Sequence, residues 1–176
     1  QGYDCSSNTA TGTLAFRKAI NAVSNPDEFD INMLVIPGLV HRLHSSVTTF
    51  AKDMCEDRQD TFFVMDAGGL NDGISTVTNT VQAFDSNYVA SYYPWVKILN
   101  TDKNKPVWVP PSVVLPGVMA FNDSVAAEWF APAGLNRGGL TNVIEAKTRL
   151  TRVERDALYE GRVNPIATFA GQGVTY

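Results

Sequence analysis

Two histidines and one aspartate are the residues best suited to hydrolytic chemistry. His41 and His44 are the only histidines of the chain and lie three residues apart at the start of a helix-like segment. Asp66 lies within "TFFVMDAGG" (61–69), directly after its apolar run, where α/β enzymes often keep an acidic residue. With one of the serines, His44 and Asp66 could form a catalytic triad. No GxSxG segment accompanies them, so we expect capping, turn and solvent-contacting roles and predict no catalytic residue.

The same histidine pair is the best candidate for a metal site. A zinc site needs further Cys, His or carboxylate ligands at suitable spacing, and no such cluster joins His41 and His44. Cys5 and Cys55 lie far apart in no metal-like spacing, which fits synthesis in a reducing compartment better than a disulfide-built secreted fold. We therefore predict no metal, no cofactor and no disulfide.

Two glycine-containing segments could be phosphate-binding loops. In "WFAPAGLNRGG" (129–139), three residues separate Gly134 from Gly138 and no lysine follows, whereas a P-loop needs four residues between its glycines and then a lysine. The segment "DAGGLNDG" (66–73) follows a strand-like run and precedes a helix-like one, a context suited to anion binding. Its two aspartates would repel an anion, so a tight turn is favoured; a flavodoxin-like ligand site there is the weaker alternative.

Composition limits the remaining classes. The 176 residues are 44% hydrophobic and 18% charged, with a net charge of -4, which is typical of one soluble globular domain. Nucleic-acid binding needs concentrated Lys and Arg, so the acidic balance argues against it. No apolar run approaches the roughly 20 residues that span a bilayer. We therefore expect neither a nucleic acid nor a membrane as partner.

Helical and strand-like periods alternate along the first half of the chain. Apolar residues recur at helical spacing in three segments: Phe16, Ile20 and Val23; Leu43, Val47, Phe50 and Met54; and Ile74, Val77, Val81 and Phe84. Continuous apolar runs follow them as predicted strands: 31–36, stopped by Pro37 and Gly38, then 61–69, and 88–98 as a single strand. This alternation predicts a three-layer α/β fold with a largely parallel or mixed sheet flanked by helices.

The second half predicts a hairpin and two more helices. Segment 100–106 is a polar turn into a strand, and Val118, Phe121, Val125 and Trp129 have helical spacing with Pro116 in the first turn and Ser112 upstream as a cap or turn residue. Segment 141–150 is extended or mixed. Thr151 and Glu154 form a capping box for a helix that Gly161 ends, and 164–176 is loop and strand.

Four segments, in this order along the chain, resemble the contractile phage tail sheath proteins. Their residue sequences resemble those of the T-even type. They are "YYPWVKI", "VWVPPSVVLPGVMAFND", "EWFAPAGLNRGGL" and "RDALYEGRVNPI", and "INMLVIPG" resembles an earlier strand of the family. The motif positions are Tyr93, Pro94, Trp95, Pro110, Pro111, Ser112, Gly117, Asp123, Trp129, Ala131, Pro132, Ala133, Gly134, Asn164 and Pro165. The resemblance covers nearly the whole chain and implies a subtilisin-like α/β core without protease activity, with residues 1–176 as one core domain of a longer chain.

The resemblance also implies a mechanical function. Sheath subunits form six-membered rings wound in a helix around the tail tube, and the sheath contracts to drive the tube through the host envelope. The implied partners are other sheath subunits, the tail tube, the baseplate and the tail terminator, and the implied location is the virion after assembly in the host bacterial cytoplasm. The alternative is an α/β hydrolase or nucleotide-binding enzyme using His44 and Asp66.

Two residues of the glycine-containing loop carry specific expectations. Trp129 is predicted to be buried against the core or a subunit seam, because a large indole in an apolar segment is typical of either place. We expect Pro132 to end the preceding helix and the glycines to adopt positive φ or close backbone packing. Arg137 either contacts solvent or pairs with an acidic neighbour in a sheath.

Overall fold

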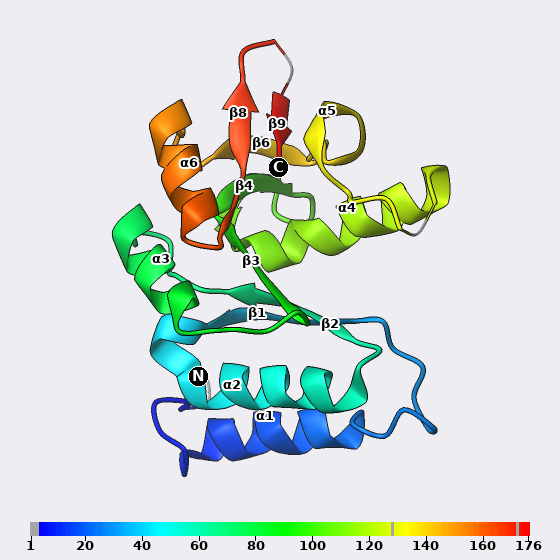
Figure 1. Ribbon diagram of the computed structural model, residues 1–176. Helices are drawn as coiled ribbons and strands as arrows, with labels where there is room; N and C mark the ends of the chain where they lie inside the picture. Colours follow the sequence, from blue (N-terminus) through cyan, green and yellow to red (C-terminus); the bar gives the residue numbers. More distant parts are fainter. Residues whose placement is uncertain (1–3, 128, 172) are drawn as a thin grey trace.

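Parallel strands form the centre of the fold, in the order β1-β2-β3-β7 (Figure 1). The computed structural model describes residues 4–127, 129–171 and 173–176. These strands are β1 (Met33–Val40), β2 (Phe62–Asp66), β3 (Val89–Tyr93) and β7 (Asn164–Pro165). Every neighbouring pair in this sheet is parallel, so the chain must cross over one face of the sheet between successive strands.

Helices cover both faces of this sheet, which confirms the predicted α/β architecture. The helices are α1 (Thr11–Ala22), α2 (His41–Arg58), α3 (Ile74–Gln82), α4 (Pro111–Val125), α5 (Gly134–Arg137) and α6 (Arg152–Glu160). In Figure 1, α2 lies on one side of β1 and β2, with α1 beneath it, and α4 lies on the other side. Alternate residues of β2 point to opposite faces, so Phe63 and Met65 join the core on the α2 side and Val64 joins the core on the α4 side.

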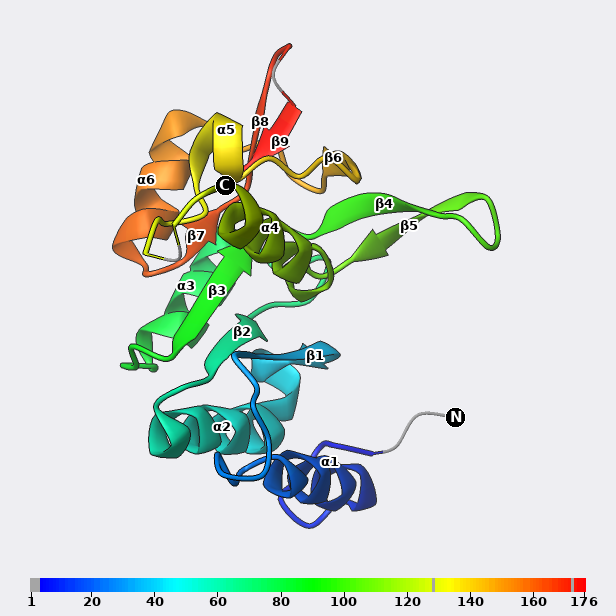
Figure 2. The same cartoon turned by 90° about the vertical axis from the view of Figure 1, so that its right-hand side faces the viewer.

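Two antiparallel sheets extend the parallel one. The first has the order β5-β4-β6, and the second is the hairpin of β8 and β9. Their strands are β4 (Val96–Asn100), β5 (Lys105–Val109), β6 (Val143–Ala146), β8 (Ala167–Phe169) and β9 (Gly173–Thr175). The β4–β5 pair confirms the predicted hairpin, which extends away from the rest of the molecule in Figure 2.

Segment 88–98 is two strands, so the prediction of one strand was wrong. β3 ends at Tyr93 in the parallel sheet, and β4 starts at Val96 in the antiparallel sheet. Pro94 lies between them and follows a cis peptide bond. A proline lacks the N–H that a central strand donates to its neighbour, so the chain leaves one sheet here and enters another.

Proline and glycine do not stop β1, in contrast to the prediction. The strand runs from Met33 to Val40, and its register with β2 shifts between Val35 and Val40. Gly38 has a φ of 92°, a value that glycine adopts without the steric cost of a Cβ. β1 is the edge of its sheet, where a proline and a bulge are both tolerated.

Helix α4 begins and ends earlier than its sequence pattern predicts. Pro111 occupies its first turn, and Pro116 lies inside the helix. The helix ends at Val125, because Ala126 is extended, with φ -136° and ψ 177°. Pro132 therefore lies beyond the helix and does not end it. Of the predicted apolar face Val118 is buried, together with Leu115 and Asn122, but Phe121 and Val125 are 52% and 57% exposed, so that part of the prediction was wrong.

Local signals in the other helices are largely confirmed. Thr151 and Glu154 form the capping box of α6, and Gly161 caps its C-terminus. Leu43 is an exception, because it is 53% exposed and does not share the buried face of Val47. The non-helical backbone at His44, with φ -131° and ψ 40°, rotates the first turn of α2 away from the helix that follows.

Candidate functional site

The end of β2 is joined to the start of α4 by a buried carboxylate. The Ser112 hydroxyl donates to Oδ2 of Asp66 at 2.6 Å, and the Ser112 backbone N–H donates to Oδ1 at 3.2 Å. Asp66 is 3% exposed and Ser112 1%. Burial raises the pKa of Asp66 to about 6, and the two hydrogen bonds from Ser112 oppose that shift. Asp66, at the end of β2, thus provides an acceptor for the N–H groups at the start of α4, which have no partner within the helix.

Ser112 does not cap α4 with its own side chain, which corrects the predicted role. Pro110 occupies the N-cap position and has no side-chain cap. Pro110 and Pro111 are both buried, and their fixed φ suits the chain that enters a helix. The Pro-Pro-Ser motif therefore positions the serine against Asp66.

The catalytic triad does not form. Nδ1 of His44 lies 3.1 Å from the backbone N of Val40, and Nδ1 of His41 lies 2.6 Å from Oγ1 of Thr48. Within the described residues, both hydrogen-bond partners of the Asp66 side chain belong to Ser112. The arrangement brings an acid and a serine together without the histidine that would take the proton of the serine. It is therefore a structural link between two elements.

Neither histidine belongs to a metal site in the described part of the chain, which holds no group of three His, Cys, Asp or Glu able to bind an ion. The His41 ring packs edge-on against Phe84, with 4.3 Å between ring centres, and burial lowers its pKa to about 4. Cys5 and Cys55 are free, buried thiols. Burial raises the pKa of Cys55 to about 11, which disfavours the reactive thiolate.

The 66–73 loop is a turn in which the backbone N–H of Gly69 donates to a side chain of the same loop. Oδ2 of Asp72 accepts the Gly69 N–H at 2.7 Å and the Arg42 Nε at 2.8 Å. Burial works against ionisation of Asp72, and these two donors outweigh it, so the pKa of this carboxyl is lowered. A Cβ on Gly68 would lie 2.5 Å from Cγ2 of Val77. The Asp72 carboxylate thus takes up the Gly69 N–H that an anion would otherwise bind, and Gly68 permits close packing.

The Tyr-Pro-Trp motif holds this turn. Nε1 of Trp95 donates to the Gly68 carbonyl at 2.9 Å, and the Tyr93 hydroxyl donates to the Asp72 carbonyl at 3.2 Å. The Tyr93 carbonyl accepts the Ile166 N–H at 2.6 Å, and Tyr93 pairs with Pro165 in the sheet. The structure thus brings three motifs that are distant in sequence to one end of the parallel sheet: Tyr93, Pro94 and Trp95; Pro110, Pro111 and Ser112; Asn164 and Pro165.

The other motif residues lie on or beside an exposed apolar surface. This group comprises Gly117, Asp123, Trp129, Ala131, Pro132, Ala133 and Gly134. Trp129 is 85% exposed, so its predicted burial in the core was wrong. The helix ends before it, and its ring stacks on Phe130 at 6.5 Å. Gly134 has a φ of 78°, and a Cβ on Gly138 would lie 2.7 Å from the Tyr176 carbonyl oxygen, which confirms the predicted roles at Gly134 and Gly138. Gly139 shows neither feature, since its Cβ would meet the Leu135 carbonyl oxygen at an ordinary 3.5 Å.

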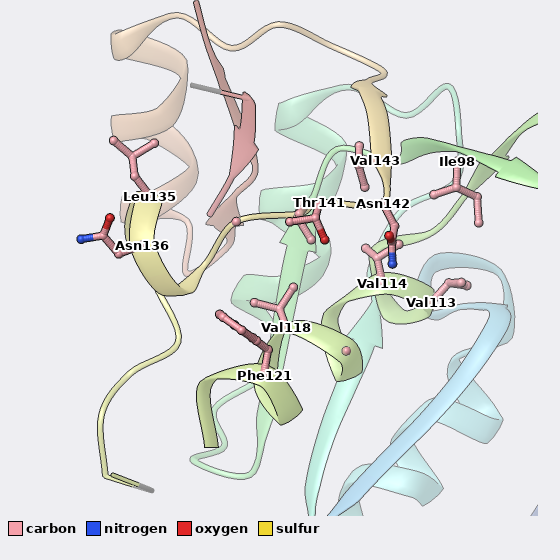
Figure 3. A pocket seen from close by; sticks show the side chains of 13 residues that line it. Ile98, Val113, Val114, Val118, Phe121, Leu135, Asn136, Thr141, Asn142 and Val143 are labelled. Atoms are coloured by element: carbon pink, nitrogen blue, oxygen red, sulfur yellow. The ribbon is translucent and has the colours of Figure 1, made fainter. Parts of the chain in front are cut away.

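A groove of about 500 Å³ lies between α4, α5 and the start of β6. Figure 3 shows Val118 and Phe121 of α4 on one side, Leu135 of α5 on another, and Ile98 and Val143 across from them. Gly117 lies one turn before Phe121, and nothing lies within 4 Å of a Cβ built on it. An exposed apolar surface of this kind is typical of a protein contact.

Arg137 lies over an aromatic ring at the edge of this surface. Its guanidinium carbon is 4.9 Å from the centre of the Phe130 ring. Within the described residues Arg137 forms no ion pair. The cation–π contact is its role inside the chain, and sequence reasoning missed it because Phe130 approaches Arg137 only through the folding of the loop.

This geometry defines an α/β structural domain, with its motifs used for internal links and for an exposed surface. The matching family model is the phage tail sheath protein central domain, which matches residues 12–175. The chain belongs to this family, which confirms the resemblance seen in the sequence. In residues 4–127, 129–171 and 173–176, no helix combines the length and apolar character needed to cross a bilayer.

Curated relatives include tail sheath proteins of two phages. The chain is 38% identical over 97 residues to that of Vibrio phage KVP40, which covers 55% of this chain and 13% of the relative. It is 33% identical over 107 residues to that of Enterobacteria phage T4, which covers 61% of this chain and 15% of the relative. The matched regions therefore span about one seventh of the length of these relatives.

Solved structures show the same fold. One is the six-fold symmetrised baseplate of the anti-feeding prophage, with a TM-score of 0.70 and 23% identity over 98% of this chain and 42% of that chain. Another is the contracted helical sheath of the same particle, with a TM-score of 0.59 and 23% identity over 98% of this chain and 43% of that chain.

Proposed function

We propose that this chain is a core domain of a contractile tail sheath subunit. Its copies would polymerise around a tail tube, and the resulting sheath would contract to drive the tube through the host cell envelope. The observation that carries the proposal is the family match over residues 12–175. The proposed partners are other sheath subunits, the tail tube, the baseplate and the tail terminator, within a virion assembled in the host cytoplasm.

The internal geometry supports a mechanical function over an enzymatic one. The Asp66 carboxylate is occupied by Ser112, and the 66–73 turn is closed by Asp72 and Trp95. These contacts connect β2, β3 and α4 into one unit. A rigid unit of this kind transmits force between neighbours, whereas a hydrolase would need a base beside the serine.

The apolar surface around α4 supports contacts between sheath subunits. Phe121, Trp129 and Leu135 are 52%, 85% and 47% exposed. Aromatic residues such as Phe121 and Trp129 are enriched at protein interfaces. We assign this surface to a neighbouring subunit, and Trp129 would lie at the seam between them.

Electron microscopy of the full-length protein tests the function. Helical tubes with a hollow core are expected, and an intact chain that stays monomeric at high concentration would contradict the proposal. A Trp129→Ser variant should fold as the wild type does and assemble less well. Leu14→Ser provides the matched control, because Leu14 is also exposed, at 53%, but lies on α1. If the two variants assemble equally well, Trp129 does not lie at the contact between subunits.

A further inference from the structure

The outward face of the β5-β4-β6 sheet carries two lysines over one tryptophan. Nζ of Lys97 lies 4.6 Å and Nζ of Lys147 lies 5.1 Å from the centre of the Trp108 ring. We call Lys97, Trp108 and Lys147 the lysine–tryptophan face. Glu145 pairs with Lys97, whereas Lys147 forms no ion pair within the described residues. The face therefore presents one ammonium group that no carboxylate of the described chain neutralises.

This face also has an apolar border. Leu99 follows Lys97 on the same side of β4, because alternate residues of a strand share a face, and it is 48% exposed. Pro106 lies opposite Leu99 in the register of β4 and β5. On the other side of β4, Val96 is fully buried in the core beneath α4 and Ile98 lines the groove. The outward side is thus an unpartnered sheet face with aromatic, aliphatic and cationic groups.

Charge around the face is opposite to that of the chain as a whole. The β4–β5 hairpin and residues 145–147 together hold four lysines against two carboxylates: Lys97, Lys103, Lys105 and Lys147 against Asp102 and Glu145. They carry a surplus of two positive charges on a chain with a net charge of -4. An acidic partner surface would complement this part of the molecule.

The segment 25–30, "NPDEFD", is such a surface, and we call it the acidic loop. Asp27, Glu28 and Asp30 are all exposed, and Phe29 between them is 42% exposed. No Lys or Arg occurs from residue 19 to residue 41. None of these three carboxylates forms an ion pair within the described ranges. The loop therefore displays three negative charges around one aromatic ring.

The acidic loop is held in place from inside. The buried Arg58 donates Nη1 to the Val23 carbonyl at 2.7 Å and Nη2 to the Phe29 carbonyl at 2.8 Å. Oδ1 of Asn25 accepts the Asp27 N–H at 3.1 Å. A loop fixed in this way loses little conformational freedom when it binds, which favours association.

Several other exposed acidic groups of the described residues are already paired with a basic side chain. Lys52 pairs with Asp53 and Glu56, and Arg162 pairs with Asp85. The acidic loop combines unpaired carboxylates with an exposed apolar side chain, which matches the mixed character of the lysine–tryptophan face.

We propose that the acidic loop of one copy of this chain binds the lysine–tryptophan face of the next copy. This inference rests on the proposed sheath function and names a contact within that assembly. The two surfaces belong to different parts of the molecule: the chain between α1 and β1 runs beside α2, and the β4–β5 hairpin extends from the other half (Figure 2). Because the surfaces differ, the contact is head-to-tail, and repeating it produces rings or helices.

Charge reversal in the full-length chain tests the contact. The loop variant carries Asp27→Lys and Glu28→Lys, and the face variant carries Lys103→Glu and Lys147→Glu. The face variant keeps the Lys97–Glu145 pair, so the sheet retains its cross-strand link. We expect each variant to associate about tenfold more weakly than the wild type in sedimentation velocity, as a few surface charge pairs allow.

Restoration of association identifies the pairing. A mixture of the two variants, or one chain with all four substitutions, should regain association, because each reversed surface then meets an opposite charge. Matched controls are Lys18→Glu with Arg152→Glu, and Asp57→Lys with Asp156→Lys, which make the same charge changes at exposed positions elsewhere. If the controls weaken association as much, or if the mixture fails to regain it, the contact is overturned.

Cross-linking of the unaltered protein separates this inference from the proposed function. A carbodiimide joins carboxylates to lysine amines in direct contact, and an equal mixture of light and heavy nitrogen-labelled chains distinguishes links between copies. Mixed-isotope links from residues 27–30 to Lys97, Lys103 or Lys147 support the contact. Helical tubes without such links overturn the contact and leave the sheath function standing; chains that form neither tubes nor links overturn both.

Discussion

Replacement of Asp66 by asparagine should remove a pH dependence of folding stability. The folded-state pKa of Asp66 is about 6 and the ordinary value is 3.8. The folded protein therefore binds a proton at Asp66 between about pH 4 and 6, where the unfolded chain has lost it. Stability from this group rises as pH falls through that window, by up to about 3 kcal/mol, because a tenfold change in proton affinity corresponds to about 1.4 kcal/mol.

An asparagine keeps the local hydrogen bonds without the charge. Its Oδ1 can accept the Ser112 N–H, and its Nδ2 can donate to the Ser112 hydroxyl. Urea unfolding of the wild type and Asp66→Asn at several pH values between 4 and 7 gives the difference in the free energy of unfolding. The wild type should gain relative to the variant as pH falls. Other groups that titrate in both proteins cancel in the difference.

An exposed carboxylate supplies the control for this measurement. Asp123→Asn makes the same substitution at an exposed position on the solvent side of α4 and is measured in the same titration. A flat difference for Asp66→Asn, or one that favours the variant at low pH, would refute the reasoning that burial dominates at Asp66. Such a result would mean that the hydrogen bonds from Ser112 and the start of α4 offset or outweigh the loss of solvation.

Further variants test other parts of the fold. Burial lowers the pKa of His41 to about 4, so the unfolded chain takes up this proton at a higher pH than the folded chain, and stability falls as pH falls from 6.5 to 4. The full shift corresponds to about 3 kcal/mol, and His41→Gln should remove about 2 kcal/mol of this loss in the same urea titration, because the partly buried ring keeps some solvent screening. Gly161→Ala places a Cβ 2.4 Å from Cγ2 of Thr78 and should lower the free energy of unfolding by about 2 kcal/mol, whereas Gly117→Ala, with open space, should leave it equal or higher; equal losses would contradict the packing argument. Trp129→Ala should change the free energy of unfolding by less than about 0.5 kcal/mol, since the side chain is exposed, and a thermal melt that falls by several degrees would show that it is buried.

Local sequence patterns predicted most of the elements. The helices with Val77 and Thr151 and the strand with Phe63 follow from signals within a few residues: apolar period, capping box and turn residues. These signals depend on the geometry of one helix or strand, so they need no knowledge of the rest of the chain. The ordered Tyr-Pro-Trp, Pro-Pro-Ser and Asn-Pro motifs likewise identified the family.

Errors arose where distant residues decide the local structure. The start of α4 depends on Asp66, which lies 46 residues earlier in the chain, and the burial of Asn122 depends on the carbonyl of Phe130, which accepts its Nδ2 at 2.9 Å. Helical spacing alone placed Phe121 and Trp129 on a buried face. It could not show that the helix ends at Val125 or that its other face packs on the sheet.

The sequence by itself determined the class of fold, the family and most of the helices. Apolar periodicity, capping residues and the order of motifs are properties of residues that are near one another in the chain. The tertiary structure alone decided what the conspicuous side chains do. In the folded chain Asp66 binds Ser112 and not His44, and Asp72 accepts a hydrogen bond within the 66–73 turn. Trp129 is exposed, and Lys97 and Lys147 lie over Trp108. These outcomes depend on which strands become neighbours and which faces remain uncovered, and both are set by the packing of the whole chain.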